Sequence, residues 1–363
     1  MLPKRIVFCG GGTRCLVFLQ GLVDLENKGM LRNVNEYWGT SAGAMIASLY
    51  ALTKSGSRVK EIMFAADYKK FRDIDVTNLL GIQQTWGLDN GTSLVQEIER
   101  IFESVEPGAK SKSLAEIPTL NIVVSDITLH ETIVCNAKTF PTLRIVDALR
   151  ASMSLPVFFR PFRHPESGNL WVDGAIKANF PWHCLPNDKA RSEALGFTFE
   201  KPYMHKTPKT FMEYIFSMIH FDEPKKISNL RQWPNIIWFT QPPYPSWFIR
   251  LQKEDFEMVE QFGKEGVEKW IITQLNHNPS AAVSNSVNLY SHSTMPSSKT
   301  PSSVHHILQS YCQKDCINEL SDTLTQDLPG CSHEVVSTHH HPSPLFPQTQ
   351  TQYKKLIYRR WSV

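Results

Sequence analysis

The sequence predicts an α/β fold whose central sheet is mostly parallel, and three observations support this prediction. A short apolar run at 6–9 ends at three glycines and leads into a segment of helical periodicity at 16–25. The same order of apolar run, sharp turn and helical segment returns at 34–52, and further apolar runs follow at 120–124 and 170–172. Consecutive strand-turn-helix units are typical of parallel sheets that are covered by helices.

Hydrophobic periodicity and glycine or proline breaks place the elements along the chain. Strands are expected at 6–9, 37–38, 120–124, 133–135, 170–172, 194–199 and 236–239. Helices are expected at 16–25, 44–52, 94–102, 147–153, 211–220 and 254–275. The strand at 133–135 is expected to pair with the strand at 120–124. This order of elements predicts one ordered domain over residues 4–275.

Composition is typical of a globular protein. The chain has 363 residues, of which 41% are hydrophobic and 20% charged, so a large core can form. The 38 basic and 35 acidic residues give a net charge of +3, and no basic field favours a nucleic-acid partner. We expect no secretory signal and no membrane span. Seven scattered cysteines indicate reduced thiols and an intracellular, cytoplasmic location.

The composition changes after residue 276. Ser, Thr, Pro, His and Gln crowd the segment up to residue 352, which holds eight of the thirteen histidines. We therefore expect residues 276–363 to form a disordered extension. The spacing of Cys312, Cys316, Cys331 and His333 is irregular for a zinc site, so no metal is expected. The basic, aromatic end at 353–361 is either a contact for anionic lipid or a solvated terminus.

A serine lies at the centre of Gly39-Thr40-Ser41-Ala42-Gly43, between an apolar run and a helical segment. A serine becomes a nucleophile on a strained strand-to-helix turn, where the residues two positions away on each side must be small. The amide of Ala42 opens the helix, where the helix dipole favours an oxyanion. The alternative role for this serine is that of a helix N-cap.

A glycine-rich stretch, Gly10-Gly11-Gly12-Thr13-Arg14, could supply the donors for an oxyanion. Residues without side chains allow backbone N–H groups at a helix start to face an anion. The stretch lacks the spacing of a dinucleotide site or a P-loop. We therefore expect the amides of Gly11, Gly12 and Thr13 to form an oxyanion hole. Arg14 is either a solvated residue or a contact for a substrate phosphate.

A candidate base lies in Asp173-Gly174-Ala175, where an acid ends a short apolar run. Acyl transfer needs a nucleophile, a base within hydrogen-bond reach and donors for the oxyanion. Ser41 would attack an ester carbonyl and Asp173 would accept its proton, although Asp173 could also be a simple turn residue. A triad with His183 is the competing mechanism. His183 stands beside Trp182, and we expect a partly buried structural histidine there instead.

Together these blocks resemble the patatin-like phospholipase family. The family joins a glycine-rich nest, a Gly-x-Ser-x-Gly elbow and an Asp-Gly-Gly/Ala motif, which correspond here to 10–15, 39–43 and 173–175. Ala-Ser-Met-Ser-Leu-Pro at 151–156 and Asn-Phe-Pro at 179–181 are similar to two further family blocks. The order and spacing agree, and the resemblance covers residues 4–275.

The resemblance implies a three-layer α/β/α fold similar to cytosolic phospholipase A2 and a Ser-Asp dyad, Ser41 and Asp173. It also implies hydrolysis of fatty-acyl esters of phospholipids, in the manner of a phospholipase A, without metal or cofactor. The same dyad could instead serve a neutral-lipid hydrolase or a transacylase, and a lipid-binding protein without turnover is the alternative from another class. Cys15 departs from the family, which usually has glycine there; a positive φ at Cys15 would be strained.

A lipid substrate also implies a membrane surface as partner, and we expect peripheral membrane association. The proline-rich apolar stretch at 242–249 is a candidate membrane contact near the mouth of the site. A buried hydrophobic plug is the alternative role for this stretch. The oligomeric state is not predicted.

Overall fold

The computed structural model describes residues 2–73, 82–200, 207, 214–215, 217, 229–245 and 250–277. Three expectations fall wholly or largely outside these residues. They concern the helix at 211–220, the membrane contact at 242–249 beyond residue 245, and the C-terminal extension from residue 278 onward.

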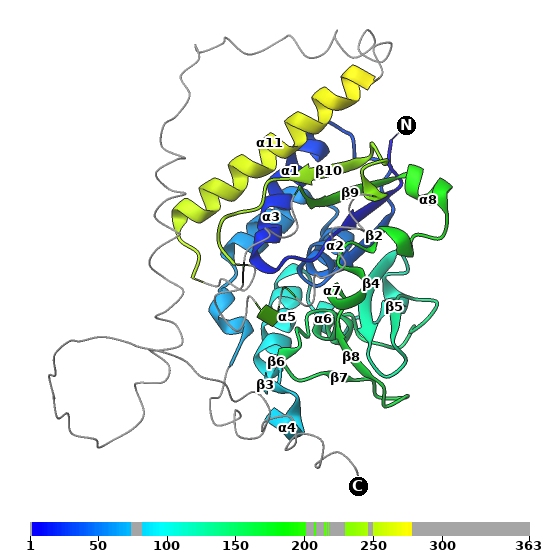
Figure 1. The fold of residues 1–363 in the computed structure, drawn as a ribbon, viewed down its shortest axis with the longest axis vertical. Coiled ribbons are helices and arrows are strands. Elements are labelled where there is room, and N and C mark those ends of the chain that lie inside the picture. Colours follow the sequence, from blue (N-terminus) through cyan, green and yellow to red (C-terminus); the bar gives the residue numbers. More distant parts are fainter. Residues whose placement is uncertain are drawn as a thin grey trace, which may run out of the picture. The chain divides into compact units, whose positions relative to one another are not determined.

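The described residues form a mixed eight-stranded sheet with the order β10-β9-β1-β2-β4-β8-β7, and β5 pairs with β4 beside this path (Figure 1). The strands are β1 (Arg5–Phe8), β2 (Glu36–Thr40), β4 (Leu120–Asp126), β5 (Glu131–Cys135), β7 (Phe162–Arg163), β8 (Leu170–Asp173), β9 (Ala194–Phe199) and β10 (Ile236–Phe239). Every strand expected from the sequence is present, and the expected pairing of β5 with β4 is confirmed and antiparallel.

The sheet is parallel in one half and antiparallel in the other. β10, β9, β1, β2 and β4 are joined by parallel pairings, whereas β5 and β8 run antiparallel to β4, and β7 runs antiparallel to β8. β4 is buried along its whole length, as a central strand covered on both faces should be. The expected mostly parallel sheet therefore gains an antiparallel extension on the β4 side.

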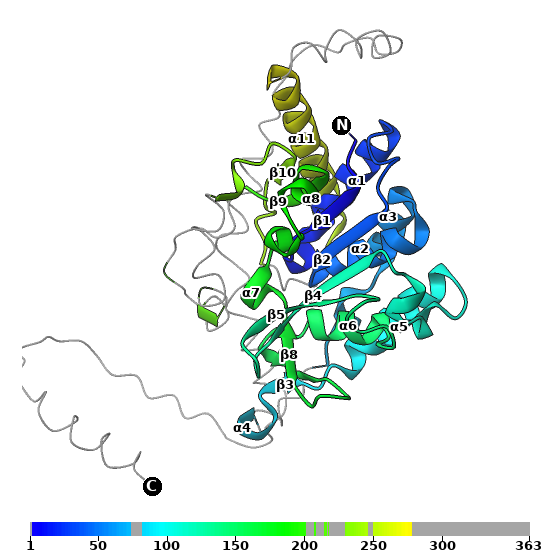
Figure 2. The same cartoon turned by 90° about the vertical axis from the view of Figure 1, so that its right-hand side faces the viewer.

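Helices cover both faces of the sheet. The longer helices are α1 (Val17–Asn27), α2 (Ala42–Thr53), α3 (Gly56–Ala65), α5 (Thr92–Val105), α6 (Ile145–Ser152) and α11 (Lys253–His277). The short ones are η1 (Gly12–Leu16), η2 (Tyr68–Phe71), α4 (Ile82–Thr85), η4 (Ala109–Ser111), η5 (Leu114–Glu116), α7 (Ala175–Ala178), η6 (Pro181–Cys184) and α8 (Asp188–Ser192). Figure 2 shows α1, α2, α3, α5 and α6 on one side of the sheet and α7 on the other.

An aromatic cluster fills the core between the parallel strands and α1. Phe8, Phe18, Phe197, Phe199 and Phe239 are buried, and their ring centroids lie 4.9–6.3 Å apart in neighbouring pairs. Large rings contribute most of the apolar area that such a core removes from water. The helix α11 packs against both α1 and β10, so this part of the core is closed by the C-terminal helix of the described chain.

Local signals explain several element boundaries. Gly29 adopts a φ of 67° after α1, and Met30 N–H donates to Leu25 O, so the helix ends at this glycine. Ser55 caps α3 by accepting a hydrogen bond from Arg58 N–H. The sequence patterns did not predict the small parallel ladder of β3 (Gly87–Asp89) and β6 (Val157–Phe159).

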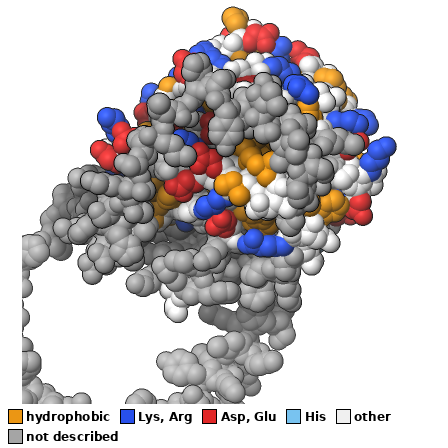
Figure 3. All heavy atoms as spheres, turned by 90° about the horizontal axis from the view of Figure 1, so that it is seen from above, with side chains coloured by type: hydrophobic (Ala, Val, Ile, Leu, Met, Phe, Trp, Pro, Cys, Tyr) orange, Lys and Arg blue, Asp and Glu red, His pale blue; other side chains and the backbone are white. Residues whose placement is uncertain are grey.

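Acidic and basic side chains are interspersed on the face seen in Figure 3, with hydrophobic side chains between them. This distribution agrees with the near balance of charges in the sequence. Within the described part of the chain, none of the helices combines the length and the hydropathy that a membrane crossing requires.

Candidate active site

The edge of β4 brings Ser41 and Asp173 together. β2 pairs with the first part of β4 and ends where Thr40 faces Val123. β8 approaches antiparallel along the same edge of β4 and ends where Asp173 faces Val124. The two strands therefore end at adjacent positions of one template strand. As a result, Ser41 Oγ donates a 2.8 Å hydrogen bond to Asp173 Oδ2, although 132 positions separate the two residues.

Ser41 occupies a strained turn between β2 and α2. Its φ of 53° and ψ of −128° lie outside the regions that side-chain-bearing residues normally adopt, and such conformations are typical of functional sites. The turn brings backbone into close contact at both flanking glycines. A Cβ on Gly39 would lie 2.4 Å from Gly43 O, and a Cβ on Gly43 would lie 2.3 Å from Cys9 O. The two glycines are therefore sterically required by the turn.

Ser152 holds the backbone of the turn. Ser41 N–H donates to Ser152 Oγ at 2.8 Å, and Ser152 Oγ donates in turn to Val123 O at 2.7 Å. Ser152 is fully buried at the C-terminal end of α6. This chain of two hydrogen bonds ties the strained residue to the template strand. Sequence analysis found the block at 151–156 without assigning a role to this serine.

The carboxylate of Asp173 is buried and accepts hydrogen bonds from two donors. Its side chain is 4% exposed, Oδ1 accepts from Ala175 N–H at 2.8 Å, and Oδ2 accepts from Ser41. Burial raises the pKa of Asp173 from 3.8 to about 6, against the opposing effect of the two hydrogen bonds. A base with this pKa is ionised at neutral pH and takes up a proton more readily than an ordinary carboxylate. The turn role that the sequence left open for Asp173 is also present, in the bond to Ala175.

The glycine-rich loop packs directly on the serine turn. Gly10 N–H donates to Asn179 O at 2.9 Å, and a Cβ on Gly10 would lie 3.3 Å from Ser41 Cβ. Gly12 adopts a φ of 55° at the start of η1. Among the described residues, no acceptor bonds the amides of Gly11 and Gly12. These two N–H groups are therefore available to an oxyanion in the site.

Arg14 and Cys15 follow the loop within η1. Arg14 Nε donates to Tyr244 O at 2.8 Å, and Nη1 donates to Gln241 Oε1 at 3.0 Å. Arg14 thus connects the glycine loop to the segment that precedes the undescribed residues 246–249. Cys15 is buried and does not have a positive φ, so the family departure at this position introduces no backbone strain.

His183 is exposed on η6, so the expected partial burial was wrong. Its backbone carbonyl accepts a hydrogen bond from Arg191 Nη2 at 3.2 Å. The expectation was based on the apolar neighbours of His183. Trp182 is indeed buried, but the adjacent histidine is exposed to solvent.

A buried arginine that the sequence analysis missed supports the loop behind the dyad. Arg150 is 5% exposed, and its guanidinium donates to Asn90 O at 3.1 Å, to Arg160 O at 2.9 Å and to the hydroxyl of Ser154. Ser154 O accepts the backbone N–H of Asp173 at 2.9 Å. Arg150 therefore fixes a loop that contacts the candidate base. In the sequence, the position of Arg150 directly before the block at 151–156 could have indicated its importance for the site.

Across residues 2–73, 82–200 and the shorter described stretches, no group of three His, Cys, Asp or Glu side chains could hold a metal ion. The described cysteines, Cys9, Cys15, Cys135 and Cys184, are not joined by disulfide bonds.

A hydroxyl on a strained strand-to-helix turn, bonded to a buried carboxylate, is typical of serine hydrolases with an α/β fold. Residues 6–185 match the family model described as Patatin-like phospholipase. This part of the chain therefore belongs to the patatin-like phospholipase family, which places the protein among lipid hydrolases.

Individual relatives differ in how much of their length they share with this chain. Uncharacterized protein R571 of Acanthamoeba polyphaga mimivirus is 24% identical over 286 residues, which are 76% of this chain and 95% of that protein. Patatin-like phospholipase domain-containing protein 6 of Homo sapiens is 31% identical over 188 residues, which are 52% of this chain but 12% of the human protein. The crystal structure of VipD from Legionella pneumophila superposes with a TM-score of 0.49 and 15% identity, covering 75% of this chain and 67% of VipD.

Proposed function

We propose that the protein is a serine acyl hydrolase that cleaves fatty-acyl esters of phospholipids, in the manner of a phospholipase A. The observation that supports this proposal most is the 2.8 Å hydrogen bond from Ser41 Oγ to the buried Asp173 Oδ2. A nucleophile and a base within hydrogen-bond reach are the minimum that acyl transfer requires. We further propose that this catalytic domain spans residues 4–275 and that the protein associates with membranes peripherally.

The first half of the proposed reaction forms an acyl-enzyme. Ser41 Oγ attacks the ester carbonyl carbon while Asp173 takes the hydroxyl proton. The carbonyl oxygen becomes an oxyanion that the amides of Gly11, Gly12 and Thr13 stabilise by hydrogen bonds. The bond to the alcohol oxygen then breaks, and Asp173 returns the proton to that oxygen, so the lysolipid leaves as a neutral alcohol.

The second half releases the fatty acid. A water molecule attacks the acyl-enzyme carbonyl while Asp173 accepts one of its protons. The bond to Ser41 Oγ breaks, and the proton passes from Asp173 back to that oxygen. The sum of the two halves is one ester and one water consumed, with one alcohol and one fatty acid released. Because Asp173 alternates between base and acid, a pKa near neutrality suits both steps.

Release of fatty acid from mixed phospholipid vesicles, with a chelator present throughout, tests this proposal. We expect activity in the wild type and a loss of at least about 1000-fold in Ser41→Ala and Asp173→Asn, because each variant lacks one member of the dyad. His183→Ala is the matched control, since this exposed histidine is the member of the competing triad. The proposal predicts that His183→Ala retains full activity.

Three outcomes would contradict the proposal. Fatty-acid release that persists in Ser41→Ala would show that another residue is the nucleophile. If the wild type releases fatty acid from none of the phospholipids but hydrolyses acylglycerols, the protein is a neutral-lipid hydrolase instead. Absence of turnover on every ester, with vesicle binding retained, would favour the lipid-binding alternative.

A further inference from the structure

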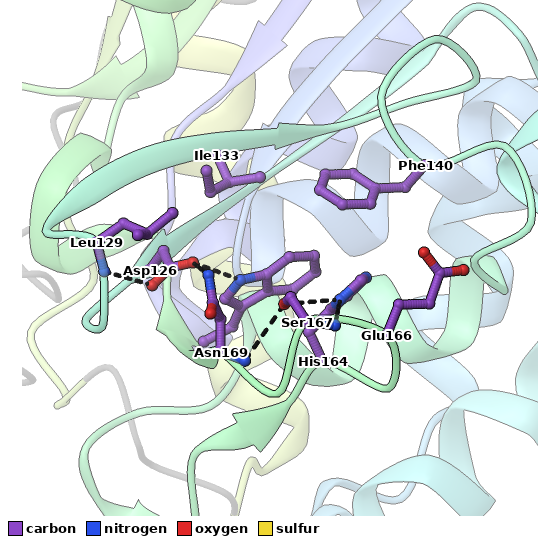
Figure 4. A pocket seen from close by; sticks show the side chains of 9 residues that line it. Asp126, Leu129, Ile133, Phe140, His164, Glu166, Ser167 and Asn169 are labelled. Atoms are coloured by element: carbon purple, nitrogen blue, oxygen red, sulfur yellow. Dashed lines mark hydrogen bonds between the residues drawn. The ribbon is translucent and has the colours of Figure 1, made fainter.

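A cavity lies beyond the dyad along β4 and β8. Its volume is about 340 Å³, within the range of small-ligand pockets. The cavity is lined by residues from the end of β4, the β4–β5 hairpin, the loop after β5, the loop at 164–169 and β8. In Figure 4, Leu129 and Asp126 lie toward one end of the cavity, and Phe140 and Glu166 lie toward the other.

Three rings meet at this cavity. Trp171 lies 5.0 Å from Phe140 and 4.4 Å from His164 between ring centroids, and Phe140 lies 5.1 Å from His164. The aliphatic side chains of Leu129 and Ile133 complete the apolar part of the lining. Aromatic rings carry negative charge on their faces, so a wall of this composition attracts organic cations.

The carboxylate of Asp126 adds a fixed negative charge behind this wall. Asp126 is 2% exposed and accepts four hydrogen bonds, from the amides of Thr128 and Leu129, from Asn169 Nδ2 and from Trp171 Nε1. Burial opposes ionisation of this group, but the four donors together hold its pKa below the usual range. The charge of Asp126 therefore persists at neutral pH without a basic partner in the lining.

The remaining polar groups of the cavity also favour a cation. Glu166 adds an exposed carboxylate at the cavity. Ser167 N–H donates to His164 Nδ1 at 3.2 Å, which fixes the orientation of this ring at the cavity. None of the described residues that line the cavity is Lys or Arg. The described lining therefore combines two carboxylates and three rings and contains no Lys or Arg side chain.

We infer that this cavity binds a quaternary ammonium group of the choline type. Such a group has an apolar surface that fits an aromatic wall and a positive charge that the two carboxylates attract, and recognition by aromatic cages is its usual mode of binding. The ammonium group could come from the head group of a choline lipid in a membrane or from a soluble choline compound.

The cavity and the dyad share one face of the sheet. Trp171 and Asp173 are two positions apart on β8, so both side chains project from the same face, roughly 7 Å apart along the strand. Asp126 faces Trp171 directly across the antiparallel ladder. A head group in the cavity would therefore lie close to the candidate base. Binding itself does not depend on the proposed hydrolysis and is measured separately from it.

Isothermal titration of the full-length protein with choline, at constant ionic strength, tests the inference. The comparison probe is the neutral carbon isostere of choline, in which a tert-butyl group replaces the trimethylammonium group. We expect saturable binding of choline and an affinity for the isostere that is lower by about 2- to 30-fold, the range that one cation–π contact supplies. Equal affinity for the two probes, or no saturable binding of choline, would overturn the inference.

Three variants locate the binding. Phe140→Leu removes one ring but keeps apolar volume, and Glu166→Gln removes the exposed charge. Phe162→Leu is the matched control, because Phe162 also packs against Trp171, at 6.1 Å, but does not line the cavity. We expect the first two variants to weaken choline binding at least twofold and Phe162→Leu to leave it unchanged. Equal weakening by Phe140→Leu and Phe162→Leu would overturn the assignment to this cavity.

Vesicle sedimentation identifies the source of the ammonium group. The Ser41→Ala protein is used so that the vesicles stay intact, with and without Phe140→Leu, on phosphatidylcholine and on phosphatidylglycerol. A loss of binding confined to phosphatidylcholine supports the site and identifies a lipid head group as its occupant. Unchanged vesicle binding, together with weakened titration by choline, supports the site and identifies a soluble cation.

Discussion

Replacing Asp173 with Asn should stabilise the fold at neutral pH while it removes the base of the dyad. Asn has nearly the same shape, and its carbonyl oxygen still accepts the hydrogen bond from Ala175 N–H. The charge is what the substitution removes. Because the site buries this carboxylate among few donors, the ionised form costs free energy that the neutral amide does not.

The pKa shift sets the size of the effect. Burial raises the folded-state pKa of Asp173 from 3.8 to about 6. An acid whose pKa is higher in the folded protein than in the unfolded chain destabilises the fold while it is ionised in both states. This destabilisation decreases as the pH drops through the folded-state pKa. The ionised Asp173 therefore lowers the free energy of unfolding by about 3 kcal/mol near pH 7.5 and by about 1 kcal/mol near pH 4.5. The gain from Asp173→Asn should therefore be about 2 kcal/mol larger at the higher pH.

Denaturant unfolding of both proteins at the two pH values measures this difference. Asp188→Asn is the control, because the Asp188 side chain is 81% exposed and its ion pair with Arg191 lies at the surface. Exposed pairs contribute little, so the control should change stability by less than about 0.5 kcal/mol at either pH. If Asp173→Asn destabilises the fold at neutral pH, or if its effect is independent of pH, then the burial of an ionised carboxylate is refuted.

Two further predictions concern catalysis. Esterase activity on a soluble ester should rise with pH through an apparent pKa of about 6, since Asp173 must be ionised to accept the proton, and a profile flat from about pH 5 to 8 would contradict this role. Ser152→Ala should lower kcat by up to about 100-fold, because the backbone of Ser41 loses its anchor. Ser48→Ala is the control for that variant, as the buried Ser48 hydroxyl has no hydrogen-bond partner within the described residues, and equal losses in the two variants would refute the anchoring role.

The sequence predicted the parallel half of the fold well because four of its five strands, β1, β4, β9 and β10, contain a mainly apolar run. Runs at 6–9, 120–124, 194–199 and 236–239 all correspond to strands, since strands buried on both faces need apolar residues throughout. The ladder of β3 and β6 was missed because each strand has three residues, too few to show a period. The short β7 escaped detection for the same reason.

The site was partly predictable for a different reason. Ser41 and Asp173 stand out locally, because Ser41 has a glycine two positions away on each side and Asp173 directly precedes a glycine at the end of an apolar run. The sequence did not show that β2 and β8 end at adjacent positions of β4, and this register is what brings the two side chains together. The residues of the cavity along β4 and β8 gave no local signal, since Phe140, His164 and Trp171 come from three segments that only the fold brings together.

Covalent labelling with a fluorophosphonate tests the central claim most directly, because the reagent reports an activated serine without requiring the natural substrate. Mass mapping of the labelled full-length protein should find one adduct, on Ser41, and labelling should be much slower in Asp173→Asn because the hydroxyl loses its base. An adduct on another serine, or equal labelling rates in the wild type and Asp173→Asn, would contradict the claim that Ser41 and Asp173 form a catalytic dyad.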